Sequence, residues 1–329
     1  MTKSLALGLA VALLAGTALT PGNGAAQGGT VSVYTAHAPE IYNEIVPKFE
    51  EATGITVSLV QAGSGDIVQR ARAEAASPLA DVIWSIGGEA LEANSDLLEP
   101  YTSSHDAELD PLYKVGTNWL PYTGIPMVLV VNTDMVAADD MPVSWADLTD
   151  PKWNQKVAYA GADSSGSAFM QLATILDVYG EEQGWELFGE MMKNFIVTGS
   201  SGRVPRGVAD GEFAVGLTLE EAAQRYVAGG ANVAIVYPEP ATSALPDAVA
   251  LVKGGPNPDA GKQFIDFVLS KEIQEFLVEQ MQRRSVRTDV AQPEGLPGLD
   301  EIAIQNYDMG WAGAERENII KRYLGILRQ

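Results

Sequence analysis

The sequence predicts an α/β fold of two doubly wound lobes, which are joined by a two-strand hinge and enclose a ligand cleft. The first observation is a strand, a polar loop and a helical pattern that follow one another three times, at residues 31–39, 57–66 and 81–90. The second is a similar series after an apolar segment at residues 124–132. Strands that alternate with helices are typical of parallel sheets, whose ligands bind beyond the carboxyl ends of the strands. We therefore expect loops of both lobes to line the cleft.

In the first lobe, the expected helices have apolar faces and recognisable ends. A helix over Pro39–Thr53 is expected to stop at Gly54, because glycine tolerates the left-handed conformation that ends a helix. Pro47 lies inside this helix and predicts a kink. A second helix is expected from Asp66 and a third near Glu89.

The apolar segment at residues 124–132 is interpreted as the strand that crosses into the second lobe. Further strands are expected at residues 156–159, 195–198 and 213–217, with a return strand at 232–237. Helices are expected to end at Tyr179, to span residues 258–281 and to span residues 314–327. These elements assign residues 27–123 and 239–285 to lobe one, and residues 124–238 and 286–329 to lobe two.

Residues 1–26 have the pattern of a secretory signal peptide. Lys3 precedes an apolar run that is short for a membrane span, and small residues follow it before Gln27. An uncleaved membrane anchor is the alternative interpretation of this run. The chain contains no cysteine, which excludes both lipid attachment at a cysteine and disulfides. We expect an exported, monomeric protein.

Charge and composition argue against several functional classes. A net charge of −22 disfavours nucleic-acid binding, because Lys and Arg are needed to contact phosphate backbones. A serine hydrolase needs a Gly-x-Ser-x-Gly turn, which is absent, and a zinc hydrolase needs ligands that two histidines and no cysteine do not supply. Glycosidases need only two carboxylates, so composition alone leaves that class open. We predict a non-enzymatic protein with no cofactor and no metal.

With these elements placed, several segments together resemble a known family. They are residues 33–35, 49–55, 80–84, 209–218, 236–239 and 256–267. In order and spacing they are similar to type II periplasmic solute-binding proteins of ABC importers, in the subgroup for ferric iron, phosphonates and sugar phosphates. The resemblance covers nearly the whole mature chain. It implies a periplasmic protein that captures one solute and delivers it to an inner-membrane permease.

Two loops have the chemistry to hold an anion. Ser64 and Gly65, and likewise Ser165, Gly166 and Ser167, directly precede expected helices. Free backbone N–H groups and the helix dipole favour negative charge there, and serine hydroxyls add donors. Ordinary helix caps would have the same residues, and one such loop alone would not decide between the two. Two loops that face each other across a cleft favour ligand binding.

The other candidates lie at the ends of expected strands. Arginine could bind a phosphate or carboxylate with two hydrogen bonds, and glutamate could bind a sugar hydroxyl or an amine. Solvated arginines and acids at helix starts are the alternatives. The complete set of predicted ligand-binding residues is Thr35, His37, Ser64, Gly65, Gly88, Glu89, Ser165, Gly166, Ser167, Ser201, Arg203, Glu220 and Tyr237.

The solute class is predicted from the absence of a tyrosine pair and from the presence of serine loops and arginines. Iron-binding members of the resembled family carry two adjacent tyrosines after the strand that is here followed by Glu220, and this chain has no adjacent tyrosines. The serine loops and arginines suit a small anionic solute, either a phosphonate or a sugar phosphate. A hexose phosphate and an aminophosphonate both remain open, and ferric iron is the alternative function.

Overall fold

The protein is described by a computed structural model that covers residues 29–328, so the predicted signal peptide lies outside the described residues. The strands are β1 (Thr30–Thr35), β2 (Thr56–Gln61), β3 (Val82–Gly87), β4 (Leu98–Glu99), β5 (Leu120–Asn132), β6 (Val157–Ala160), β7 (Phe195–Thr198), β8 (Val215–Leu219), β9 (Val233–Val236), β10 (Ala244–Val252) and β11 (Arg284–Ser285). The helices are α1 (Pro39–Thr53), α2 (Ser64–Ala73), α3 (Gly88–Glu92), α4 (Gly166–Tyr179), α5 (Glu181–Met192), α6 (Arg203–Ala209), α7 (Glu220–Ala228), α8 (Pro258–Leu269), α9 (Lys271–Met281) and α10 (Met309–Ile326).

The strands form two groups that share one long strand, β5. Their hydrogen-bonded order is β2-β1-β3-β10-β5-β8-β6-β7, with β4 beside β10 and both β9 and β11 beside β5. β1 is parallel to β2 and β3, and β6 is parallel to β7 and β8, as strand–helix alternation predicts. β5 pairs with β10 as far as Pro126 and with β8 from Met127 onward. The predicted α/β class is confirmed, and the crossing falls within the apolar segment that the sequence indicates.

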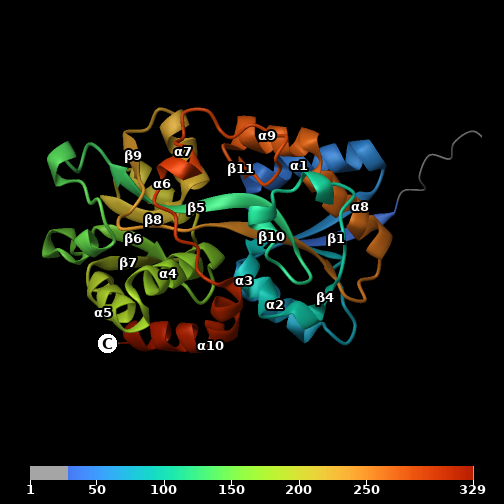
Figure 1. Ribbon diagram of the computed structural model, residues 1–329, viewed down its shortest axis with the longest axis horizontal. Helices are drawn as coiled ribbons and strands as arrows, with labels where there is room; N and C mark the ends of the chain where they lie inside the picture. The colour runs from blue at the N-terminus through green and yellow to red at the C-terminus, as the bar shows by residue number, and fades with distance from the viewer. Residues whose placement is uncertain (1–28, 329) are drawn as a thin grey trace, which may run out of the picture.

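Helices cover both faces of the first strand group (Figure 1). α1, α8 and α9 lie on one face, while α2 and α3 lie on the other. Between the strands and the first face, fully buried Phe49, Trp84 and Phe264 pack edge to face, with ring centroids 5.1 to 5.3 Å apart. These rings anchor α1 and α8 against β3, and the carboxyl ends of β1, β2 and β3 are thereby held in place.

Several elements differ from the expected ones. The strand expected at residues 232–237 is β9, which pairs antiparallel with β5 and does not lead back to the first group. That return is made by β10, which the sequence analysis did not identify. The helix expected over residues 258–281 is interrupted at Ser270, whose extended backbone ends α8 and begins α9. By contrast, α1 spans Pro47 as one helix with the expected ends.

The C-terminal helix α10 contacts α3 beside the first strand group and α4 and α5 beside the second (Figure 1). Its Arg316 lies 3.3 Å from the buried carboxylate of Glu89 at the start of α3, and its guanidinium carbon is 4.0 Å from the ring centroid of Phe169 in α4. The helix begins earlier than expected, at Met309, because Asp308 accepts hydrogen bonds from the backbone N–H groups of its first turn. α10 is therefore a connection between the groups that is separate from β5.

The aromatic cluster yields a stability prediction. Phe264→Ala removes a fully buried ring, so we expect the free energy of unfolding to fall by about 3–5 kcal/mol. Leu112→Ala is the control, because that side chain is 60% exposed and should change the stability little. Urea unfolding of both variants checks this, and equal effects would show that the cluster is not an anchor.

Candidate functional site

A cavity of about 330 Å³ lies where the two strand groups meet. The first strand group contributes the segments that follow β1 and β2 and the end of β3. The second strand group contributes the loops that follow β6 and β7 and the start of α7, which follows β8. Its volume is in the range of small-molecule sites. The loops meet here because parallel strands place their carboxyl ends at one edge.

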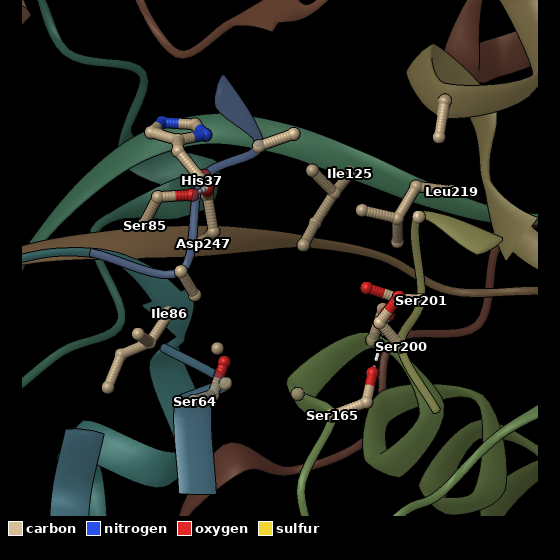
Figure 2. A pocket seen from close by; sticks show the side chains of 18 of the residues that line it. His37, Ser64, Ser85, Ile86, Ile125, Ser165, Ser200, Ser201, Leu219 and Asp247 are labelled. Atoms are coloured by element: carbon tan, nitrogen blue, oxygen red, sulfur yellow. Dashed lines mark hydrogen bonds between the residues drawn. The ribbon is translucent and has the colours of Figure 1, made fainter. Parts of the chain in front are cut away.

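Serines from three separate loops lie on one side of this cavity (Figure 2). Ser64 is the first residue of α2, Ser165 precedes α4, and Ser201 lies in the loop before α6. Ser165 Oγ caps α4 by accepting a hydrogen bond from Ala168 N at 3.3 Å, and it lies 3.1 Å from Ser167 Oγ. Ser165 therefore both caps helix α4 and lines the cavity.

The loops of Ser64 and Ser165, which come from different strand groups, touch each other. Gly65 N donates a hydrogen bond to Ser164 O at 3.3 Å. A Cβ atom on Gly65 would lie 2.6 Å from Asp163 O, and one on Gly166 would lie 2.6 Å from Ser64 Oγ. Both distances are far below van der Waals contact. At Gly65 the obstacle is a backbone atom, so glycine is required there for this approach of the loops, whereas at Gly166 it is a serine side chain.

A buried network of charged groups forms the opposite wall of the cavity. Arg283 donates to Asp247 Oδ2 at 2.9 Å and to Glu221 Oε1 at 3.1 Å, and each of these three side chains is less than a tenth exposed. Asp247 also accepts hydrogen bonds from Thr123 and from Ser85 Oγ, the latter at 2.6 Å. Burial raises the pKa of Asp247, and Arg283 opposes this rise. The network fixes the polar groups before any ligand arrives.

Ser85 has an unusual backbone at this wall. Its φ of 58° lies in the left-handed region, which is uncommon for a residue other than glycine. Its hydroxyl is held by Asp247, so the hydrogen bond and the local backbone conformation occur together (Figure 2). Strained residues of this kind are concentrated at ligand-binding sites.

Next to this network, Arg284 pairs with Glu220. Arg284 Nε and Nη2 donate to the two carboxylate oxygens at 2.7 and 2.8 Å, and both side chains are almost fully buried. The hydroxyl of Tyr237 also donates to Glu220. Burial, followed by the negative charge of Glu220, raises the pKa of Tyr237. Glu220 and Tyr237 are thus engaged within the protein and do not line the cavity.

His37 lies at the end of β1 on the cavity wall, where its ring is almost completely buried. The ring packs edge-on against Trp84 at 4.5 Å and Tyr122 at 5.4 Å, between centroids. Burial, and then the charges of Arg283 and Arg225, lower the pKa of His37 well below its usual value. The imidazole is therefore neutral at pH 7, and its Nε2 has no hydrogen-bond partner among the described residues.

The structure brings about half of the predicted site residues to the cavity. Those that line it are His37, Ser64, Ser165, Gly166, Ser167 and Ser201. Those that do not are Thr35, Gly65, Gly88, Glu89, Arg203, Glu220 and Tyr237. Cavity-lining residues outside the predicted set include Ser85, Thr218, Glu221, Arg225, Asp247 and Arg283. Glu221 follows an expected strand and is, like Glu220, a candidate for binding a sugar hydroxyl or an amine, and Arg283 stands out because it is next to Arg284 in an acidic chain.

Physical reasons explain why several predicted residues lie elsewhere. Arg203 points to solvent and pairs with Glu212 at 2.7 Å. Glu89 is completely buried beneath α10, where burial raises its pKa despite the nearby Arg316. Gly88 permits close packing, because a Cβ there would lie 2.6 Å from the ring of Trp119. Thr35 is buried, and its hydroxyl accepts a hydrogen bond from the backbone of the next loop.

Comparison with known proteins identifies the family to which this architecture belongs. Residues 44–301 match the model of the bacterial extracellular solute-binding proteins. The chain belongs to this family. The solute-binding protein is also 29% identical to a Haemophilus influenzae protein of undefined function, over 98% of this chain and 97% of the other.

For three further relatives, the name or the solved structure refers to a ligand. A Salmonella typhimurium protein, assigned as a periplasmic 2-aminoethylphosphonate-binding protein, is 28% identical over 74% of this chain and 73% of its own length. The periplasmic binding protein AfuA of Actinobacillus pleuropneumoniae, solved with fructose-6-phosphate bound, is 26% identical, with a TM-score of 0.87 over 91% of this chain and 99% of AfuA. Iron-bound HitA of Pseudomonas aeruginosa shares the fold, with a TM-score of 0.78 at 21% identity over 90% of this chain and 99% of HitA.

The solute-binding protein is therefore the periplasmic, non-enzymatic component of an ABC importer, with a solute ligand and a permease partner. Within residues 29–328, no helix has the length and apolar character to cross a membrane. In the same residues, His, Asp and Glu side chains do not gather in groups of three or more that could hold a metal ion.

The neutral state of His37 yields a pH prediction. Below about pH 6.5 the unfolded chain binds a proton at this residue and the folded chain does not, so stability falls as pH falls. We expect a loss of about 1.4 kcal/mol in unfolding free energy for each pH unit below that point. His37→Gln should remove this component. Equal pH dependence of the two proteins in urea unfolding, between about pH 7.5 and about pH 5.5, would show that His37 is not the titrating group.

Proposed function

We propose that the protein binds a small phosphorylated or phosphonate solute between two lobes and closes around it before docking to its permease. The lobes correspond to the two strand groups, with the hinge at the point where β5 changes partner between Pro126 and Met127. The observation that carries the proposal is the convergence of three serine-bearing loops on one cavity.

The serine side of the cavity suits the anionic end of such a solute. α2 and α4 both begin there, and the amino end of a helix carries partial positive charge and unpaired N–H groups. Hydroxyls of Ser64, Ser165 and Ser167 add donors that can rotate toward phosphate oxygens. Names of relatives that refer to a phosphonate and to a sugar phosphate support this class of solute.

Ferric iron is less consistent with the residues at this cavity. Iron(III) favours hard oxygen ligands such as phenolates and carboxylates. Among the described residues that line the cavity there is no tyrosine, and nearby Tyr237 already donates to Glu220. Relatives include ferric-binding proteins, for example that of Neisseria meningitidis serogroup B at 25% identity, so a ferric salt belongs in the test.

A solute panel tests the proposal. Protein refolded from denaturant to remove bound solute should be stabilised by a hexose phosphate or 2-aminoethylphosphonate, by about 2.7 kcal/mol at 100 times the dissociation constant. The double variant Ser165→Ala, Ser167→Ala should weaken that binding by about 1–3 kcal/mol, because hydrogen bonds to a charged group are lost. Arg203→Ala is the control, since its side chain points away from the cavity. Stabilisation by a ferric salt alone would overturn the proposal.

The glycine contacts between the loops test closure. Gly65→Ala should weaken solute binding by about tenfold or more, because its new Cβ blocks the approach of Asp163 O. The ligand-free variant should be as stable as wild type or slightly more so, since alanine favours helix α2.

Gly189→Ala is the matched control for this closure test. It also places alanine in a helix, and its Cβ meets no atom within 4 Å. Unchanged affinity in Gly65→Ala, measured by titration calorimetry, would mean that the two loops need not touch in the bound state.

A further inference from the structure

The charged wall of the cavity contains one donor and one acceptor that make no hydrogen bond among the described residues. Glu221 Oε2 is buried without a hydrogen-bond partner among the described residues, and so is Arg225 Nε. These two atoms face each other as an ion pair at 3.5 Å, without a hydrogen bond between them. Both side chains line the cavity, and that of Glu221 is 8% exposed. A buried polar atom without a partner is costly, so a ligand atom is the expected partner.

The other carboxylate oxygens at this wall are already occupied. Asp247 Oδ1 accepts from Thr123, and its Oδ2 accepts from Ser85 and Arg283. Glu221 Oε1 accepts from Arg283 at 3.1 Å. Only one acceptor oxygen of the two acids therefore remains for a ligand.

The charges at this wall balance. The carboxylates of Asp247 and Glu221 are matched by the guanidinium groups of Arg283 and Arg225, and the imidazole of His37 is neutral. Glu221 in particular lies between two arginines, at 3.1 Å from Arg283 and 3.5 Å from Arg225. A ligand ammonium at Glu221 would add an uncompensated positive charge to this balanced and poorly solvated wall, because both carboxylates are already matched by arginines.

A hydroxyl fits this arrangement better than an ammonium. It donates one hydrogen bond and accepts others, whereas an ammonium only donates. A hydroxyl can therefore donate to Glu221 Oε2 and accept from Arg225 Nε, and it introduces no charge. A ligand that carries several hydroxyls and one phosphate would satisfy this wall and the serine side of the cavity together.

We propose that the solute is a sugar phosphate, with hydroxyls bound by Glu221 and Arg225 and the phosphate bound by the serine loops, and that aminoalkylphosphonates are discriminated against. This inference rests on the proposed binding of a phosphorus-containing anion at the same cavity. The sequence leaves hexose phosphates and aminophosphonates open, and the charge balance of the wall favours the hexose phosphates.

Titration calorimetry on refolded protein with glucose 6-phosphate, fructose 6-phosphate, 2-aminoethylphosphonate and orthophosphate tests the inference. We expect at least one hexose phosphate to bind about tenfold or more tightly than 2-aminoethylphosphonate and orthophosphate. Tighter binding of 2-aminoethylphosphonate would overturn this inference and leave the proposed function standing. Binding of none of the four, with binding of a ferric salt, would overturn both.

Substitutions then locate the hydroxyl contacts. Glu221→Gln and Arg225→Met should each weaken hexose phosphate binding by about tenfold and leave orthophosphate binding within about twofold. Glu212→Gln is the control, because this acid is exposed and pairs only with Arg203. Arg225 is partly exposed, so its variant should fold even if Glu221→Gln does not, as thermal unfolding will show. An equal loss for hexose phosphate and orthophosphate in Arg225→Met would contradict the assignment.

Discussion

Two consecutive glutamates that pair with two consecutive arginines hold the site together. Glu220 pairs with Arg284 and Glu221 with Arg283, and all four side chains are buried. The acids begin α7 in the second strand group, whereas the arginines lie at β11, which pairs with the first part of β5. Loss of one partner would leave a buried charge uncompensated, which lowers the stability of the fold by about 3–5 kcal/mol. The position of the cavity's charged wall depends on this double pairing.

This pairing makes the two sides of the cavity different in rigidity. Arg283 also reaches Asp247 on β10, and Asp247 in turn holds Ser85 on β3, so a chain of hydrogen bonds extends from α7 into the first strand group. The charged wall is rigid and internally neutralised. The serine side is made of loops and helix starts whose donors remain adaptable. In the proposed function, the rigid wall would discriminate between solutes and the serine side would bind their anionic group. Such a site needs no strong excess of positive charge, which fits a chain of net charge −22.

Local signals predicted much of this fold, and long-range pairing explains what they missed. The strand–loop–helix units and the ends of α1 follow from apolar periodicity and Gly54, and the serine loops follow from their place before helices. β10 was missed because Pro246 and Asp247 are unfavourable inside a central strand. They are tolerated because the register shifts next to Asp247, and because Arg283, distant in sequence, neutralises its carboxylate. Arg203 was selected for its position after a turn, but a local acid engages it instead.

The C-terminal helix has a consequence for how easily the protein opens. Arg316 of α10 touches Glu89 beside the first strand group and Phe169 in the second. If the groups separate, α10 must stay with one of them, and Arg316 must leave either an aromatic face or a completely buried carboxylate. A carboxylate left alone in that position would have to be hydrated or protonated. If the protein opens and closes as proposed, the balance between the two forms depends partly on this buried contact, which does not line the cavity.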